Sequence, residues 1–447
     1  MNSVLDIEKP VKIDKIFQSP RLNLNQALCP HCDLVVDLPR LKLNQKADCP
    51  RCHTTLKINW SEPFNRATTY SAAALFMLIL ANLFTFVSLS VAGLSSNISL
   101  TSVLEIMVDQ RYDLLALLFM IFVQILPAFC MFALFCISTR MPMPYRLKIF
   151  LAKWLILLKP WCMVEIFLVG VLVSFVKLMS YGSIDIGPSF IAFCAYCILH
   201  VRAFQYADKT WIWGTIAKAP DIRPLKAGVS GLEQQVKSCH CCGAILVEQS
   251  VNCTRCFTTS YARKKESIQI TLALLIGSIV LYIPANVLPI MTTLAFGSSM
   301  DSTIMAGVVL LWGGGAYPIA LIIFIASVLV PSLKMGAIAW LCWCTKTKKV
   351  LSGHRMMQVY EVVELVGRWS MVDVFVIAVL VGLVSFGNLM NIFPAQGVIY
   401  FAFVVIVTMV ASVFFDPRLM WDRRSENLKR KLETNKRSLH LGITKLA

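Results

Sequence analysis

The strongest constraint on the fold is a set of apolar runs, each long enough to cross a membrane. They lie at roughly residues 68–92, 114–138, 155–180, 186–206, 268–294, 316–343, 370–390 and 393–415. At a rise of 1.5 Å per residue, about 20 helical residues cover the roughly 30 Å hydrocarbon core of a bilayer. The whole chain is 57% hydrophobic, with a mean hydropathy of +0.68. We therefore predict an all-α polytopic membrane protein.

The chain is also an internal duplication. A shift of 204 residues carries several features of the first half onto the second: Cys49 onto Cys253, Cys52 onto Cys256, Asn82 onto Asn286 and Pro127 onto Pro331. By the third apolar run the shift is 208, which carries Trp161 onto Trp369 and Glu165 onto Asp373. A shift that holds across cysteines, prolines and apolar runs indicates two copies of one unit. The prediction is two tandem four-helix transmembrane modules.

The positive charges are unevenly placed, and this predicts the orientation. The net charge is +17, and the basic residues gather before the third and seventh runs, between the modules and in the tail. Loops 93–113 and 295–315 carry Arg111 but four carboxylates. Since Lys and Arg are enriched on the cytoplasmic side, both termini and all the paired cysteines are predicted to be cytoplasmic. The short basic stretches carry no nucleic-acid motif beyond zinc knuckles, so no nucleic-acid partner is predicted.

Each module follows a pair of C-x-x-C motifs. The ligands predicted from this spacing are Cys29, Cys32, Cys49 and Cys52 in the first cluster, and Cys239, Cys242, Cys253 and Cys256 in the second. Paired knuckles joined by a short hairpin match tetrahedral Zn²⁺, and a cytoplasmic location argues against disulfides. We predict two structural zinc ribbons with short strands; an iron site of the rubredoxin type is an alternative. The neighbouring His31, His53, His240 and Cys241 are interpreted as non-ligating.

The pattern divides the chain into six segments. They are a flexible leader (1–28), zinc ribbon 1 (29–60), transmembrane module 1 (66–206), a linker (207–266) with zinc ribbon 2 (239–256), transmembrane module 2 (267–415), and a basic cytoplasmic tail (416–447). The first apolar run is full length and follows a polar stretch, so no cleavable signal peptide is predicted. Stretches 145–159 and 356–368 fit either interfacial amphipathic helices or extensions of the third and seventh spans.

Four ionisable residues inside apolar runs are the candidate transport residues: Lys177, Lys334, Glu165 and Asp373. Charges in lipid are costly, so such residues are expected to face protein or a cavity. Lys177 can also be interpreted as snorkelling to the outer interface, whereas Lys334 lies deeper. No catalytic triad, HExxH or phosphate loop occurs in the sequence, and we predict no enzyme activity.

The paired C-P-x-C knuckles, the duplicated four-span module and the segment from Trp161 to Lys177 with its counterpart from Trp369 resemble the paraquat-inducible protein A family (PqiA and LetA/YebS), with the LetA branch expected to be nearest. This resemblance implies a multi-pass component of a bacterial inner membrane. It further implies a periplasmic MCE-domain partner that forms a tunnel, and phospholipids as the transported molecules.

Three functional hypotheses remain open. The first is a transporter that moves phospholipids between the inner membrane and the MCE-domain protein. The second is a passive zinc-stapled scaffold that anchors and gates that partner, and the third is a metal or redox sensor. A scaffold should tolerate neutral substitutions at the intramembrane charges, whereas a transporter should not. The direction of transport, the lipid class and the energy source are not predicted by the sequence.

Overall fold

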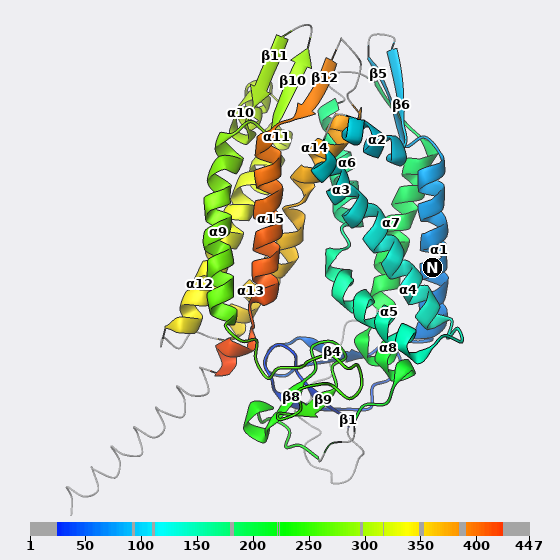
Figure 1. Ribbon diagram of the computed structural model, residues 1–447, viewed down its shortest axis with the longest axis vertical. Helices are drawn as coiled ribbons and strands as arrows, with labels where there is room; N and C mark the ends of the chain where they lie inside the picture. The colour runs from blue at the N-terminus through cyan, green and yellow to red at the C-terminus, as the bar shows by residue number, and fades with distance from the viewer. Residues whose placement is uncertain are drawn as a thin grey trace, which may run out of the picture.

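The computed structural model describes residues 25–91, 94–109, 112–178, 183–220, 222, 224–295, 298–315, 317–347, 353–383 and 390–422 (Figure 1). Most of the predicted leader and of the basic tail lies outside these residues. Two groups of helices stand side by side. Short strands lie beyond one end of the helices, and the cysteine-rich ribbons lie at the other end (Figure 1).

Module 1 follows a simple order. It contains α1 (Pro63–Leu83), the hairpin β5 (Val87–Val91) and β6 (Leu94–Ile98), α2 (Leu100–Asp109), α3 (Asp113–Phe119), the π-helix η2 (Met120–Ile125) and α4 (Leu126–Ser138). Then come α5 (Tyr145–Leu158), the 3-10 turn η3 (Lys159–Trp161), α6 (Val164–Leu178), β7 (Ser183–Ile186), α7 (Pro188–Tyr206) and α8 (Lys209–Ile216).

Module 2 repeats that order. It contains α9 (Ser267–Val287), β10 (Met291–Ala295), β11 (Ser298–Ser302), α10 (Ile304–Gly313), α11 (Tyr317–Phe324), the π-helix η5 (Ile325–Leu329) and α12 (Val330–Lys346). Then come α13 (Gly353–Trp369), α14 (Val372–Leu383), β12 (Met390–Pro394) and α15 (Gln396–Phe414). The helices and strands of module 1, from α1 to α7, begin about 204 or 208 residues before their counterparts in module 2, as the sequence shifts predict.

Each module carries a three-stranded antiparallel sheet that the sequence did not predict. The strand orders are β6-β5-β7 and β11-β10-β12. Val87 pairs with both Ile98 and Ile186, and its repeat mate Met291 pairs with both Ser302 and Pro394. The third strand arrives from about a hundred residues away, so each sheet ties the start of a module to its end. These sheets lie at the end of the molecule that the charge pattern predicts to be periplasmic.

The two π-helices have an identifiable cause. Each ends directly before a Leu-Pro or Val-Pro pair, Leu126-Pro127 in module 1 and Val330-Pro331 in module 2. Proline has no amide hydrogen and clashes with the carbonyl four residues earlier, and a single wide turn relieves both problems. The kinks that the sequence predicts at these prolines therefore take the form of π turns.

Helix length and apolarity confirm a polytopic membrane protein. Six described helices or fused helices are long and apolar enough to span, and α7 with α8 makes a seventh if this pair, bent by 67°, counts as one span. The predicted run 370–390 corresponds to α14 and continues into residues outside the described ranges. Tyr145–Phe175 counts as one 31-residue candidate span. Such a helix is longer than the roughly 20 residues a bilayer needs, which favours an extended third span over an interfacial helix.

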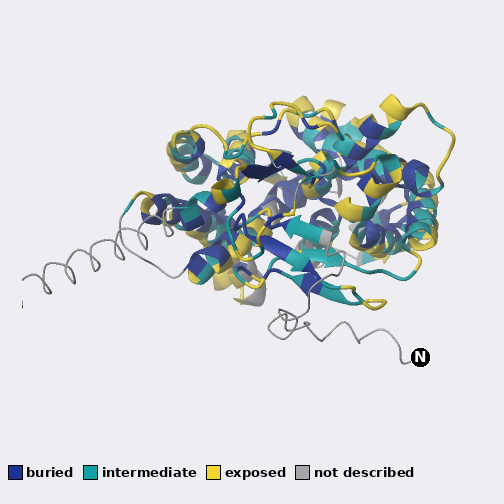
Figure 2. Ribbon diagram, turned by 90° about the horizontal axis from the view of Figure 1, so that it is seen from below, coloured by how far each residue is buried: buried dark blue, intermediate teal, exposed yellow. Residues whose placement is uncertain are grey.

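The modules meet through α6 and α14, the mated third and seventh spans. A Cβ placed on Gly170 would lie 3.2 Å from Phe375 Cβ, and Ser174 Oγ donates to Val376 O at 3.3 Å. Phe167 meets Phe375 edge to face at 5.8 Å between ring centroids. Small residues allow this close approach, as is usual where helices pack in membranes. Seen from the ribbon end, buried residues lie on the inner faces of both helical groups (Figure 2).

Candidate functional site

All four C-x-x-C knuckles share one backbone geometry. In the first, the Cys29 amide donates to Leu34 O and the Asp33 amide donates to Cys29 O, both at 3.0 Å. The same two bonds recur from Cys49, Cys239 and Cys253. The residue four positions after each first cysteine has a positive φ: Asp33 59°, His53 62°, Gly243 71° and Phe257 57°. The repeated left-handed turn aims both thiols of a knuckle at one point.

The eight predicted cysteines converge into two buried sets. Within each set the four sulfurs lie within 4.8 Å of one another. The nearest pairs are Cys29–Cys52 at 3.4 Å, and Cys32–Cys49, Cys239–Cys256 and Cys242–Cys253 at 3.5 Å. Tetrahedral Zn–S bonds of about 2.3 Å require sulfurs roughly 3.8 Å apart, so each set fits one metal ion. Both clusters could therefore hold a metal.

The electrostatics of the clusters point the same way. A hydrogen bond with Cys29, together with burial, raises the pKa of the Cys32 thiol, and a hydrogen bond with Cys239 does the same for Cys242. Hydrogen bonds with Cys29 and with Cys239 lower the pKa of the Cys52 and Cys256 thiols, so protons are shared unequally within each set. A bound cation would stabilise the deprotonated form of all four ligands, because metal binding favours the thiolate.

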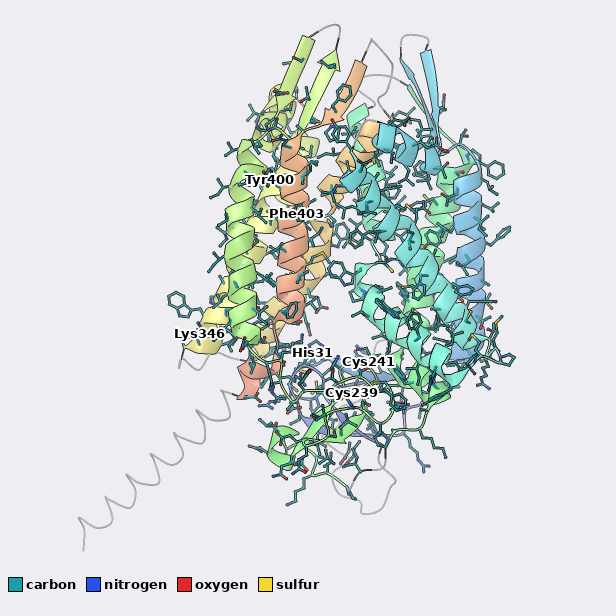
Figure 3. All side chains as sticks on the ribbon, viewed as in Figure 1. His31, Cys239, Cys241, Lys346, Tyr400 and Phe403 are labelled. Carbon is teal, nitrogen blue, oxygen red and sulfur yellow. The ribbon has the colours of Figure 1, made fainter. Side chains whose placement is uncertain are left out.

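The neighbouring residues have other roles. Cys241 is not among the converging sulfurs, and the turn at Gly243 follows Cys239 by four residues, so the 239/242 register is the one that folds. His31 packs on Tyr360 at 6.2 Å between ring centroids, and burial lowers the pKa of His31 below its ordinary value. His53 packs on His354 at 5.2 Å. Figure 3 shows His31, Cys239 and Cys241 together in the body beneath the helices.

The ribbons are crossed relative to the chain order. Ribbon 1 (residues 25–60) precedes module 1 but packs on module 2 through the two histidine contacts with α13 and through Arg51, whose guanidinium lies 4.4 Å from the Trp421 ring centroid. Ribbon 2 (residues 236–259) precedes module 2 but binds α8 of module 1. Lys209 Nζ donates to His240 O at 3.5 Å, and Arg255 Nε donates to Ala217 O at 2.9 Å. The two ribbons together, here called the ribbon body, therefore join the two modules.

A buried ion pair closes this body. Arg263 donates to both Asp422 oxygens at 2.6 and 2.7 Å and to Asp33 Oδ2 at 2.8 Å. Asp33 is 1% exposed and also accepts from Ser230 Oγ and the Leu232 amide. Burial opposes the charge of Arg263, but the carboxylates of Asp422 and Asp33 outweigh it and raise the pKa of the guanidinium. One arginine thus links ribbon 1, the approach to α9 and the segment after α15.

Lys334 is the candidate transport residue that the structure describes most fully. Its side chain is 3% exposed in α12, and Nζ donates to Thr408 Oγ1 at 3.1 Å and to Gly367 O at 3.5 Å. A Cβ on Gly367 would lie 2.8 Å from Nζ, so glycine there makes room for the amine. Within the described residues no carboxylate pairs with Lys334. Ser370, three residues after Gly367, has a buried hydroxyl without a hydrogen-bond partner.

The equivalent positions of module 1 hold different polar groups. The repeat shifts relate Lys334 to Cys130, Gly367 to Lys159 and Thr408 to His200. Lys159 Nζ donates to Phe204 O at 2.8 Å. The amine thus comes from α12 in module 2 and from the turn before α6 in module 1. The sequence interpretation missed Thr408, Gly367 and His200, because they meet Lys334 or Glu165 only through packing between distant segments.

The other three candidates have different outcomes. Glu165 lies on α6 with its side chain 45% exposed, and one carboxylate oxygen is 3.7 Å from Nδ1 of the fully buried His200. Lys177 lies in the last turn of α6 and Asp373 near the start of α14, but their side chains lie outside the described residues. The predicted role of these three residues in transport therefore stays a prediction.

Comparisons with known proteins agree with the architecture. The paraquat-inducible protein A family matches residues 64–217 and 268–425, which are the two modules. The chain is 54% identical over 401 residues to the intermembrane transport protein PqiA of Escherichia coli K12, covering 90% of this chain and 96% of the relative. A probable intermembrane transport protein of Haemophilus influenzae is 28% identical over 88% of this chain and 95% of its own length.

A third relative is the lipophilic envelope-spanning tunnel protein A of E. coli K12, with 28% identity over 88% of this chain and 90% of its own length. The expectation that the LetA branch would be nearest is wrong, because identity to that relative is 28% against 54% to the PqiA protein. No solved structure gives a significant match. The matches over both modules show that the chain belongs to the paraquat-inducible protein A family.

Proposed function

We propose that the protein moves phospholipids between the bacterial inner membrane and a periplasmic MCE-domain tunnel protein. Two relatives named as intermembrane transport proteins, one of them 54% identical over 90% of this chain, support envelope transport. The third is named as part of an envelope-spanning tunnel and as lipophilic. The positive-inside pattern supports placing both termini in the cytoplasm.

One feature of module 2 carries the proposal. An apolar groove of about 420 Å³ lies between α10 and α11, at the end of the molecule away from the ribbons (Figure 1). Its described lining is wholly apolar and includes Val309, Trp312 and Phe324. Val309 and Trp312 are 64% and 53% exposed, so the groove is open to its surroundings. A cleft of this size suits an apolar ligand, and an acyl chain at the periplasmic end of a span is the ligand that lipid transport requires.

Lys334 supports the same function from inside the span. A buried amine held by one hydroxyl and one carbonyl is a costly arrangement in a membrane, and such residues commonly mark the path of a substrate or a proton. Lys177, Glu165 and Asp373 remain candidates for the same task. The two cysteine clusters are proposed as structural zinc sites, closed to substrate because all four ligand positions are filled by cysteine.

The test is transfer of a labelled phospholipid from proteoliposomes holding the full-length protein to a purified MCE-domain acceptor. Lys334→Met keeps an unbranched side chain, one heavy atom shorter, and removes its charge, and the fold should tolerate it because an uncompensated buried charge is lost. We expect transfer to fall by about tenfold or more, which corresponds to one charge-assisted contact. Lys346→Met is the matched control, since Lys346 is exposed in the last turn of the same helix.

A passive scaffold gives the opposite result. It would bind the acceptor and retain full transfer in the Lys334→Met protein, and normal transfer at normal expression would exclude Lys334 from the mechanism. Loss of acceptor binding together with transfer would assign the residue to assembly instead.

A further inference from the structure

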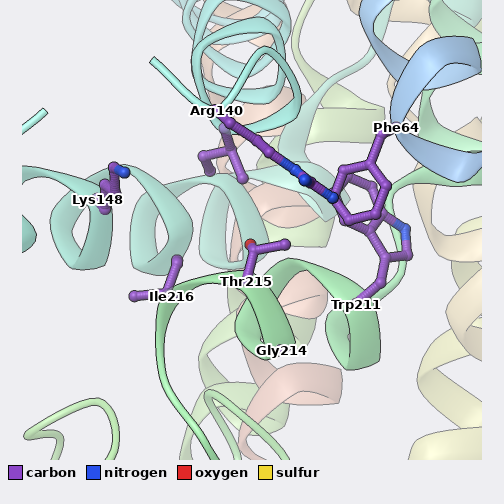
Figure 4. A pocket seen from close by; sticks show the side chains of 8 residues that line it. Phe64, Arg140, Lys148, Trp211, Gly214, Thr215 and Ile216 are labelled. Atoms are coloured by element: carbon purple, nitrogen blue, oxygen red, sulfur yellow. The ribbon is translucent and has the colours of Figure 1, made fainter. Parts of the chain in front are cut away.

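A second cavity lies in module 1, at the end of its helices nearest the ribbons, where four elements meet. It has a volume of about 600 Å³ and is lined from α1, from α5, from α8 and from the end of α4 with the turn that follows it (Figure 4). This size falls within the usual range of small-molecule sites. The cavity is separate from the apolar groove between α10 and α11 and from Lys334, and the proposed transport mechanism does not use it.

The cavity lies at the level where the membrane meets the cytoplasm. α1 begins at Pro63 and α4 ends at Ser138, and both helices are candidate spans. α8 leaves α7 at an angle of 67° and carries the partly exposed Trp211, whereas Trp213 is fully buried in the protein. A partly exposed tryptophan on a short helix beside the end of a span is typical of the interfacial zone, where lipid head groups lie.

The lining combines positive charge with an apolar floor. Arg140 and Lys148 supply two cations and Thr215 a hydroxyl, whereas Phe64 and Trp211 supply aromatic surface. None of the described lining residues is acidic, and within the described residues neither cation forms an ion pair with a carboxylate. The charge of the cavity is therefore uncompensated by the protein. An anionic group with an attached apolar tail has the complementary chemistry.

The local structure holds Arg140 in this position. The chain leaves α4 with Arg140 at a φ of 52°, the left-handed region that residues other than glycine adopt rarely. The guanidinium lies 4.3 Å from the ring centroid of Phe64, whose ring in turn meets Trp211 edge to face at 5.0 Å. Figure 4 shows Arg140 extending toward Phe64 above Thr215 and Trp211, with Lys148 on the far side. The cation–π contact orients the arginine and leaves its other N–H groups available to a ligand.

The described counterparts in module 2 differ from this arrangement. Phe64 corresponds to Ile268 and Lys148 to Met356, while Arg140 lies where the shift changes from 204 to 208 and corresponds to Cys344 or Lys348. The positive-inside rule requires cytoplasmic charge in both modules, but it does not require this aromatic and cationic cavity. The aromatic ring of Phe64 and the cation of Lys148 are therefore not repeated at the matching positions of module 2.

We propose that this cavity binds the phosphate head group of an anionic phospholipid in the cytoplasmic leaflet, with Arg140 and Lys148 on the phosphate and the acyl chains against α1 and α8. This site deepens the proposed transport function by assigning where lipid of that leaflet is held. A free phosphate shares the head-group chemistry but gains nothing from the apolar floor, so a lipid should bind more tightly than the ion.

The test uses the full-length protein in phosphatidylcholine vesicles containing a photoactivatable phosphatidylglycerol. Cross-linked peptides are mapped by mass spectrometry. We expect labelling of α8 to fall about tenfold or more in the Arg140→Gln/Lys148→Gln protein, because two charge-assisted contacts are lost. The matched control is Arg146→Gln/Lys153→Gln, which removes two cations of α5 that do not line the cavity and should leave labelling unchanged.

A second variant blocks the cavity without changing its charge. A Cβ on Gly214 meets no atom within 4 Å, so Gly214→Trp is compatible with the fold and should fill the cavity and abolish labelling. If both double variants lost labelling equally, the effect would come from general surface charge and not from the cavity, and the proposal would be overturned. Unchanged labelling in the Arg140→Gln/Lys148→Gln protein would also overturn it, as would inorganic phosphate competing as well as a short-chain phosphatidylglycerol.

The test separates this site from the transport function. The Lys334→Met protein should still be labelled at α8 even if its transport is lost. Labelling that depends on Arg140 and Lys148 would stand even if the protein proved to be a scaffold. Conversely, normal transport with no labelling of α8 would reject the head-group site alone.

Discussion

Arg263 offers the sharpest test of how the ribbon body joins the two modules. Arg263→Met removes the only described cation paired with Asp33, whose side chain is 1% exposed. The Asp33 carboxylate then keeps only the Ser230 hydroxyl and the Leu232 amide. Breaking a buried pair on one side costs about 3–5 kcal/mol, because the remaining charge is left without compensation. We expect ribbon 1 to open locally by that amount while the spans stay folded.

The assay is hydrogen exchange with mass spectrometry on the full-length protein in a lipid environment. A loss of about 3 kcal/mol in local opening corresponds to roughly a hundredfold faster exchange. The effect should concentrate in β1 (Asn25–Leu28), in β2 (Val35–Leu38) and in residues 228–231, which bond to ribbon 1 through the Val35 amide and the Gly231 amide. Replacing both partners, as Asp33→Asn with Arg263→Met, should recover part of the loss.

The matched control lies in the same ribbon. Lys46 pairs with Asp48 at 3.3 Å, but the two side chains are 34% and 16% exposed. Exposed pairs contribute about 0–1 kcal/mol, so Lys46→Met should change exchange by no more than about fivefold. If Arg263→Met accelerates exchange no more than Lys46→Met does, the buried pair does not close the ribbon body and the reasoning fails.

Three further outcomes are expected. Metal analysis should find two zinc ions per chain, one for each four-cysteine cluster, and Cys32→Ser should remove one of them. Gly170→Leu should separate α6 from α14, since even a Cβ would lie 3.2 Å from Phe375. The free energy of unfolding should fall by an overpacking cost of about 1–3 kcal/mol. Gly277→Leu, on an open face, should not lower it. Burial opposes the charge of Asp416, but Arg418 outweighs it and lowers the pKa of that carboxyl below its ordinary value of 3.8. The ionised Asp416 therefore stabilises the fold fully above pH 3.8, and this stabilisation is lost as the pH falls through the lower folded pKa. Unfolding followed against pH should lose this acid dependence in Asp416→Asn, and an unchanged profile would contradict the assignment.

Much of the architecture could be predicted because it depends on local rules. The length of an apolar run is set by bilayer thickness, and the duplicated shift follows directly from the order of residues. The clustering of the eight cysteines could be predicted for the same reason. A knuckle is closed by hydrogen bonds within six residues, as between Cys29 and Leu34, and so its spacing is visible in the sequence.

Contacts between distant segments were a different matter. The crossed packing of the ribbons, the third strand of each sheet and the pairing of Lys334 with Thr408 join residues far apart in the chain, and no local pattern encodes them. The cationic cavity needs four elements to converge on Arg140. By itself the sequence determined that the chain is a polytopic membrane protein, that it is an internal duplication, and which cysteines converge. Only the tertiary structure decided which module each ribbon packs against and which charged side chains lie together, because those contacts depend on packing rather than on composition.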